Sequence, residues 1–307
     1  MPDKLLDLKE AIGRHVRSGD RVVLGACLEP EVPFAAAHEI VRQQITGLNM
    51  VAPISDVSTD MLIGAGCCSD VTGAWVGNVS SGLGHNYRRA VEQGDPARVT
   101  VHDHSNFSLG MALMAGAYGM PYAPLRSILG SDILQSNPVF RLADNPFSED
   151  REKIVLVPPL QPDVAIIAVQ RADRFGNNHH WGSRGLIFEA AMAAEKLILL
   201  ADEIVDPEVI LSDPGRVLIP GFLTTAVCHV PAGSHPAPMT GRWQRDTAFF
   251  GNYHNCSRSR SGFLDWLDEW VLQVPDHAAY RAKLGNRLEE LKITGAAPGA
   301  TANYAAR

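Results

Sequence analysis

Five consecutive polar residues, His102 to Asn106, form the stretch of this chain best suited to acid–base chemistry. They follow an apolar run that predicts a strand, so His102 and His104 should face one way and Asp103 the other. Asp103 and His104 are therefore candidates to move a proton. Two imidazoles on one face could also bind zinc, but no third ligand stands at a recognisable spacing, so we expect no metal here. Ser105 and Asn106 could bind a substrate, and Ser105 could instead be the N-cap of the next helix.

The second candidate is the turn Gly25-Ala26-Cys27, between a predicted strand and a predicted helix. Small residues at such a turn let a substrate approach the backbone, and free amides near a helix N-terminus can hold an oxyanion or a phosphate. Cys27 could act as a nucleophile, but no histidine or asparagine partner is identifiable from its spacing. The turn therefore predicts a binding role.

Three further residues could bind an anionic group. Ser80 and Ser81 provide neighbouring hydroxyls in a run of small residues, and Arg126 carries a guanidinium fork that suits a carboxylate. The alternative for Arg126 is an ordinary surface salt bridge, which the sequence leaves open.

The elements that must position these residues alternate between strands and helices. Strands are expected at 21–24, 48–53, 71–76, 99–101, 164–169 and 196–200, and helices at 5–16, 33–44, 83–92, 105–118 and 186–194. This alternation predicts an α/β fold, with a layered, open, mostly parallel sheet and flanking helices. The run at 164–169 is continuous and mostly β-branched, which fits a central strand covered on both faces.

Outside this alternation, three segments are distinct. Residues 134–152 are rich in proline, asparagine and aspartate, and we expect a long surface loop. Residues 245–292 are expected to be helical, with Trp266, Leu267 and Trp270 packing in the core or, alternatively, against a partner. We expect one domain over 1–294 and a disordered tail over 295–307, which is rich in alanine and glycine.

The composition excludes several classes of protein. The net charge is −7 and the basic residues are scattered, which argues against a nucleic-acid binder. No apolar run is long enough to cross a bilayer, so we expect no membrane association. The five cysteines are odd in number and lack paired spacing, which is typical of reduced thiols and predicts a cytoplasmic protein.

Taken together, these segments resemble the α-subunit of the family I coenzyme A (CoA) transferases, particularly the branch similar to glutaconate CoA-transferase. The resemblance covers most of the chain and depends on the order and spacing of its motifs. These motifs are Gly19 to Cys27, Pro33 to Arg42, Ile63 to Cys67, Val76 to Asn78, His104 to Asn106, Gly119 to Pro121, Arg126 to Asp132, Arg171 to Asn177, Pro231 to Pro236 and the region of Arg245 and Asp246.

The resemblance implies a fold of the CoA-transferase type and an α₂β₂ assembly with a β-subunit. In this family the β-subunit provides a glutamate that attacks an acyl-CoA, receives the CoA and passes it to a second carboxylate. The motif around that glutamate does not occur in this chain. CoA and its esters would be substrates, and no permanently bound cofactor is implied. Gly25-Ala26-Cys27 would be the loop that stabilises the oxyanion.

Two departures from the family pattern leave alternatives open. The oxyanion loop commonly has two consecutive glycines, whereas here the second is Ala26, and His102-Asp103-His104 replaces a segment that is often acidic. One alternative is therefore an acyl-CoA hydrolase or ring-opening enzyme on the same scaffold, with Asp103 or His104 as acid–base group. Another is a non-catalytic protein that binds CoA esters or a partner. The acyl group is not predictable, because specificity depends on a few converging side chains.

Overall fold

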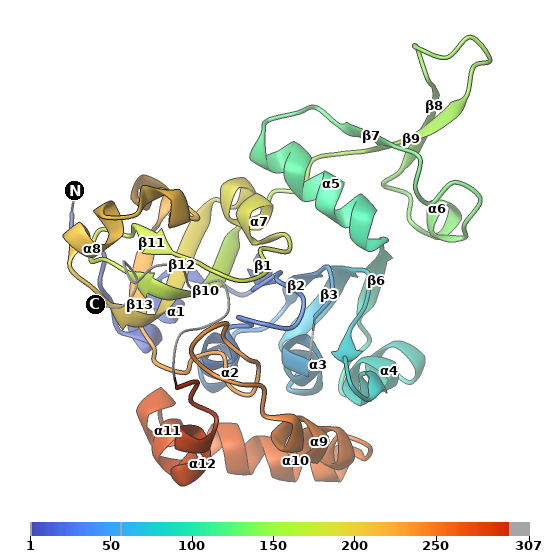
Figure 1. Cartoon of the computed structure of the whole chain (residues 1–307). Helices are drawn as coiled ribbons and strands as arrows, with labels where there is room; N and C mark the ends of the chain where they lie inside the picture. Colours follow the sequence, from blue (N-terminus) through green and yellow to red (C-terminus); the bar gives the residue numbers. More distant parts are fainter. Residues whose placement is uncertain (1, 56, 295–307) are drawn as a thin grey trace.

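The computed structural model of the chain describes residues 2–55 and 57–294, and it is built around an eight-stranded sheet (Figure 1). In spatial order the main strands are β13 (Ala226–His229), β12 (Lys196–Ile204), β10 (Val164–Ala172), β1 (Arg21–Leu24), β2 (Leu48–Ala52), β3 (Cys68–Gly73) and β6 (Thr100–Asp103). Each of these pairs with its neighbours in parallel, and β11 (Asn178–His179) adds an antiparallel pair to the end of β10. The predicted α/β fold with a mostly parallel sheet is confirmed.

Helices cover both faces of this sheet because its strands are apolar on both faces. In β1, Val22 and Leu24 point into one core, and Val23 points into the other. Helices α1 (Leu8–His15), α2 (Phe34–Arg42) and α3 (Val57–Gly64) pack on the first face, and α4 (His85–Glu92) lies beside α3. Helices α5 (Asn106–Ala117) and α7 (Ile187–Ala193) pack on the second (Figure 1). All nine residues of β10 are buried, as expected for a central strand.

The C-terminal helices form a further layer beyond α2 and α3 (Figure 1). They are α9 (Thr247–Cys256), α10 (Arg260–Leu267), the π-helical turn η3 (Asp268–Leu272), α11 (His277–Leu284) and α12 (Asn286–Glu290). Trp266 and Leu267 are buried in the same core as α2, and Trp270 packs against that core. The helical character of this region and the core position of its apolar stripe are therefore confirmed.

The expectation of a long loop at 134–152 is wrong. Strand β8 (Arg141–Asp144) lies there, and it pairs with β9 (Lys153–Val157), which also pairs with β7 (Ala123–Leu125). Helix α6 (Ile133–Ser136) precedes β8, and the three strands extend away from the main sheet beyond α5 (Figure 1). The strand was missed because Arg141-Leu-Ala-Asp144 has a charged residue at each end, and its apolar stretch is only two residues long. Its order comes from backbone pairing with β9.

The remaining described elements are short. They are β4 (Gly77–Asn78), β5 (Gly82–Leu83), α8 (Pro207–Leu211), η1 (Pro214–Arg216) and η2 (Gly221–Leu223).

Two predicted strands have different bounds in the structure. Strand β3 begins and ends three residues earlier than the predicted 71–76, and β12 extends four residues beyond the predicted 196–200. Among the helices described here, none has the length and apolar character that crossing a membrane requires. The tail predicted at 295–307 lies outside the described residues.

Candidate active site

The order of the strands places a candidate site at the carboxyl end of β1. From β1 the chain moves in one direction through β2, β3 and β6, and it then returns to build β10, β12 and β13 on the opposite side of β1. The connections therefore diverge between β1 and β10, and in open α/β sheets ligands bind in the crevice at such a point. The loop that leaves β1 here begins with Gly25-Ala26-Cys27.

A cavity of about 450 Å³ lies beside this loop, large enough for a small substrate. Its wall is mostly apolar, and helix α5 provides almost half of its lining residues. The lining consists of Ala26, Leu28, Pro53, Asn106, Phe107, Gly110, Met111, Met114, Gly185, Leu186 and Glu189. Among these residues Asn106 and Glu189 have polar side chains, and Glu189 alone is ionisable. The cavity therefore suits an acyl chain with few polar groups.

The loop after β1 has an unusual backbone. Gly25, Ala26, Leu28 and Glu31 all have positive φ, at 77°, 82°, 72° and 55°. The Ala26 carbonyl accepts a hydrogen bond of 2.8 Å from the Leu186 amide, which joins the two backbone segments that line the cavity. Because side chains with a Cβ rarely adopt positive φ, this loop stores strain that its contacts must offset.

We expect Ala26→Gly to stabilise the protein, because glycine adopts a φ of 82° without steric cost. The gain should be about 1 kcal/mol, reduced by the greater freedom of glycine in the unfolded chain. Urea unfolding at constant m-value measures this difference. Ala190→Gly, at a buried position within helix α7, is the control and should destabilise by at least about 1 kcal/mol, because it adds backbone freedom and removes a packed methyl group. Destabilisation by Ala26→Gly would mean that the methyl group contributes more packing energy than strain.

The start of α5 holds two of the predicted residues, Ser105 and Asn106, at a wall of the cavity. The Ser105 side chain accepts from the Ser108 amide at 3.0 Å, so Ser105 is the N-cap of the helix. Asn106 follows it, lines the cavity and is exposed. The first amides of a helix lack intrahelical acceptors and carry its positive dipole end, so this wall can attract an anionic group.

His104 and Asp103 are placed differently from each other. His104 is buried, its Nδ1 lies 3.1 Å from the Ser108 hydroxyl, and its ring packs edge-on against Phe140. Burial lowers the pKa of His104 to about 4, so its imidazole is neutral at neutral pH. Asp103 is exposed, and neither residue lines the cavity.

The other predicted binders also lie away from the cavity lining. Ser80 and Ser81 are exposed between β4 and β5. The Arg126 side chain is 71% exposed and forms an ion pair of 2.7 Å with Glu152 at the three-stranded sheet. This is the surface salt bridge that the sequence left open.

Of the predicted residues, Ala26 and Asn106 therefore meet at one cavity, and Gly25 and Cys27 adjoin it.

Behind the cavity wall is a buried cluster that the sequence analysis missed. Cys27, Glu31 and His180 have their sulfur, oxygen and nitrogen atoms within 4.8 Å of one another. Glu31 accepts from the Thr240 amide at 2.8 Å and from Gln170 Nε2 at 3.3 Å, and its Oε2 lies 3.4 Å from Cys27 Sγ. The signal was weak because His180 is 149 residues from Glu31, and only the pairing of β11 with β10 brings it near.

The environment of this cluster favours its neutral forms. Burial raises the pKa of Glu31 to about 7, although the Thr240 amide and Cys27 lower it in part. Burial and the nearby Glu31 also raise the pKa of the Cys27 thiol. Burial and Arg184 lower the pKa of His180 to about 4. A Cys27 thiol of this kind is a poor nucleophile, because the thiolate is the reactive form.

Comparison with known proteins shows which proteins this chain and its fold resemble. Residues 5–229 match the family model described as coenzyme A transferase. The A subunit of the 3-oxoadipate CoA-transferase of Pseudomonas knackmussii is 39% identical, over 92% of this chain and 98% of that protein. The A subunit of the glutaconate CoA-transferase of Acidaminococcus fermentans is 33% identical, over 94% of this chain and 95% of that protein. The crystal structure of the latter enzyme superposes with a TM-score of 0.91 over 96% of this chain and 97% of the crystallised one, at 33% identity.

Proposed function

The chain belongs to the coenzyme A transferase family, and from this premise we propose that it is the A subunit of a heteromeric enzyme that moves CoA from an acyl-CoA to a carboxylic acid. One observation carries this proposal: two relatives that are named as A subunits match the chain over at least 92% of its length and over at least 95% of their own. A protein colinear with such a relative is expected to need the corresponding B subunit. We propose that this partner provides the nucleophilic glutamate.

The cavity supports the division of roles between the two subunits. The acyl part of the substrate would lie on the apolar wall formed by Phe107, Met111 and Met114. The amides at the start of α5 and in the loop at Ala26 would stabilise negative charge on the acyl oxygen. The partner's carboxylate would attack the thioester carbonyl and release CoA as a thiolate. That thiolate would then attack the resulting anhydride at the glutamyl carbonyl, releasing the first acid and leaving a glutamyl-CoA thioester for the second acid.

The surface of the chain supports association with such a partner. Phe147 is 95% exposed and Leu142 is also exposed, and both belong to the segment from β8 to β9, which extends away from the main sheet. We propose an α₂β₂ assembly, as the family resemblance implies. We also propose a cytoplasmic location, because all five cysteines are unpaired thiols.

The test is reconstitution. This chain is tagged in its own cells, the co-purifying partner is identified by mass, and the two proteins are assayed separately and together for CoA transfer between an acyl-CoA and a carboxylate. Transfer should require both proteins, and CoA release without an acceptor acid should be negligible. Full transferase activity of this chain alone would overturn the proposal.

Asp103→Asn separates this function from acyl-CoA hydrolysis. Because Asp103 is exposed and outside the cavity lining, transfer by the reconstituted enzyme should stay within about 3-fold of the wild type. Steady-state CoA release with and without acceptor acid measures both reactions. Acceptor-independent CoA release that disappears in Asp103→Asn would instead identify a hydrolase that uses this carboxylate.

A further inference from the structure

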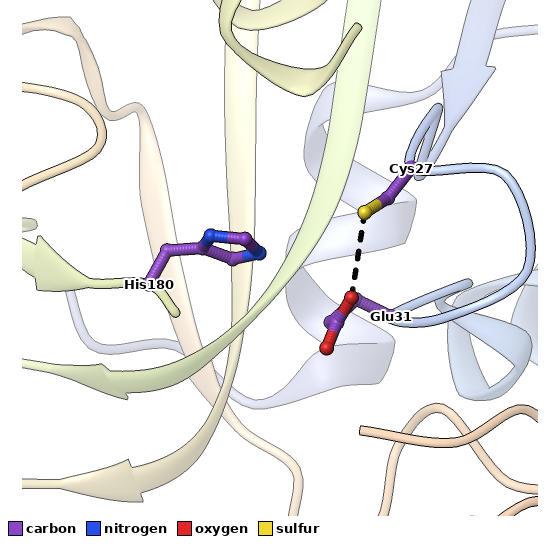
Figure 2. A group of neighbouring side chains, drawn as sticks. All are labelled: Cys27, Glu31 and His180. Carbon is purple, nitrogen blue, oxygen red and sulfur yellow. Dashed lines mark hydrogen bonds between the residues drawn. The ribbon is translucent and has the colours of Figure 1, made fainter. Parts of the chain in front are cut away.

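His180 has an unsatisfied imidazole in the protein interior. The residue is 4% exposed, and neither ring nitrogen has a hydrogen-bond partner among the described residues. Buried polar atoms are nearly always bonded, because an unpaired one loses its hydration without compensation. Figure 2 shows the ring directed toward the side chains of Cys27 and Glu31. A ligand between these three side chains would satisfy the ring.

The three side chains present the donor atoms of a transition-metal site. They offer one sulfur, one carboxylate oxygen and one imidazole nitrogen, which together suit zinc and not magnesium or calcium. In a tetrahedral zinc site, sulfur and oxygen ligands stand roughly 3.6 Å apart, given the usual bond lengths. Cys27 Sγ and Glu31 Oε2 are already 3.4 Å apart (Figure 2). The Ser183 carbonyl accepts from Cys27 Sγ, so it lies beside the sulfur ligand.

The charges also balance. A thiolate and a carboxylate would neutralise a divalent ion, and the neutral imidazole would add no charge. A net neutral site is the form of ion binding that costs least in a buried environment. Gln170 already fixes the surroundings, because its Nε2 donates to the Trp181 carbonyl at 2.9 Å and to Glu31. These hydrogen bonds hold Glu31 and the segment that carries His180 in position before any ion binds.

We propose that Cys27, Glu31 and His180 form a zinc-binding site behind the wall of the cavity. The ion would connect the strained loop after β1, which provides two ligands, to the segment after β11, which provides the third. It would thereby stabilise the positions of Ala26 and Gly185 at the cavity. Its role is structural, since all three ligands are buried and absent from the cavity lining.

Metal content and cobalt spectroscopy test this site without reference to catalysis. The full chain is purified from zinc-supplemented cells without chelators, and its metals are measured by mass spectrometry; we expect about one zinc per chain. The metal-depleted protein is then titrated with Co²⁺. A sulfur ligand should produce a thiolate-to-cobalt charge-transfer band, and zinc should remove the band by displacing cobalt.

Substitution of each proposed ligand shows which side chains bind the metal. Cys27→Ser should abolish the charge-transfer band, and His180→Gln and Glu31→Gln should each weaken zinc binding by at least about 10-fold. Cys256→Ser, at a half-buried cysteine outside the cluster, is the matched control and should leave the band unchanged. Zinc binding should also release protons from Cys27 and Glu31, because both groups must be deprotonated to bind the ion.

Any of three results would overturn the proposal. The folded wild-type protein could bind cobalt without a thiolate band, or it could hold no zinc above background. The band could also persist in Cys27→Ser. Because the wild-type titration is decisive by itself, a variant that fails to fold does not remove the test. If the chain proved not to be a transferase subunit, the zinc site would still be testable, because neither metal content nor the cobalt spectrum depends on CoA.

Discussion

Replacement of Gly185 by alanine is expected to destabilise the protein by about 3 kcal/mol and to lower kcat/KM of the reconstituted enzyme at least 100-fold. A Cβ at this position would lie 2.5 Å from the Ala26 carbonyl oxygen and 2.7 Å from the Cys27 Cα. Both atoms belong to the backbone, so no side-chain rotation relieves the clash. The loop must shift away, and with it the cavity wall and the hydrogen bond from the Leu186 amide to Ala26.

Gly119→Ala is the matched control for this variant. Gly119 also has positive φ, at 64° against 48° for Gly185, but a Cβ there would meet no atom within 4 Å. It should therefore cost only the backbone term of about 1 kcal/mol and leave kcat/KM within about 3-fold. Urea unfolding and steady-state kinetics on both variants isolate the clash from the conformational strain. Equal effects of the two substitutions would show that the approach of Gly185 to the loop is not needed.

The main sheet could be predicted from the sequence because the apolar runs that mark its strands are local features of the chain. Val164 to Val169 is apolar without interruption, and such a run specifies a strand buried on both faces whatever its neighbours are. Arg141-Leu-Ala-Asp144 carries no such signal, and its strand exists because β9 offers it a partner. The hydrogen bonds of this pairing join backbone groups, so a short strand without an apolar or alternating pattern leaves little signal in the sequence.

The candidate site was predicted in part for a similar reason. Ala26 and Asn106 were found because small or polar residues at strand-to-helix junctions mark the edge where parallel strands end. Met111 and Met114 were not, since an apolar pair at helical spacing is usually core and only the tertiary structure shows that it faces a cavity. Glu31 and His180 meet through the sheet order alone, which no spacing encodes.

Replacement of Asp246 by alanine is expected to destabilise the protein by about 3 kcal/mol at pH 7, because it removes the shared acceptor of a buried network. Asp246 is 2% exposed, its Oδ1 caps helix α9 by accepting from the Phe249 amide at 2.8 Å, and its Oδ2 lies 3.1 Å from His235 Nε2. Arg287 of helix α12 donates to both oxygens. Without the carboxylate, the buried His235 imidazole keeps the Tyr280 hydroxyl but loses its second partner, and the Arg287 guanidinium loses both acceptor oxygens. The C-terminal layer thereby loses one of its connections to the segment after β13.

The dependence on pH distinguishes this network from ordinary packing. Burial raises the pKa of Asp246, but hydrogen bonds from Arg287, His235 and the Phe249 amide outweigh it, so the pKa lies below its ordinary value of 3.8. The stability that the ionised form provides is therefore present above about pH 4, and it is lost as the pH falls toward the lower folded-state pKa. Urea unfolding of wild type and Asp246→Ala should accordingly give curves that converge in acid.

Two further substitutions separate the contributions of Asp246. Asp246→Asn keeps an N-cap but removes the charge, so it should retain part of the stability and lose the convergence in acid. Asp144→Ala removes one member of an exposed pair with Lys153 and should cost less than about 1 kcal/mol at any pH. A loss in Asp246→Ala that is the same at pH 3 and pH 7 would assign its effect to packing alone. Convergence in acid would instead show that the ionised carboxylate, shared by His235 and Arg287, holds the C-terminal helices on the sheet that carries the cavity.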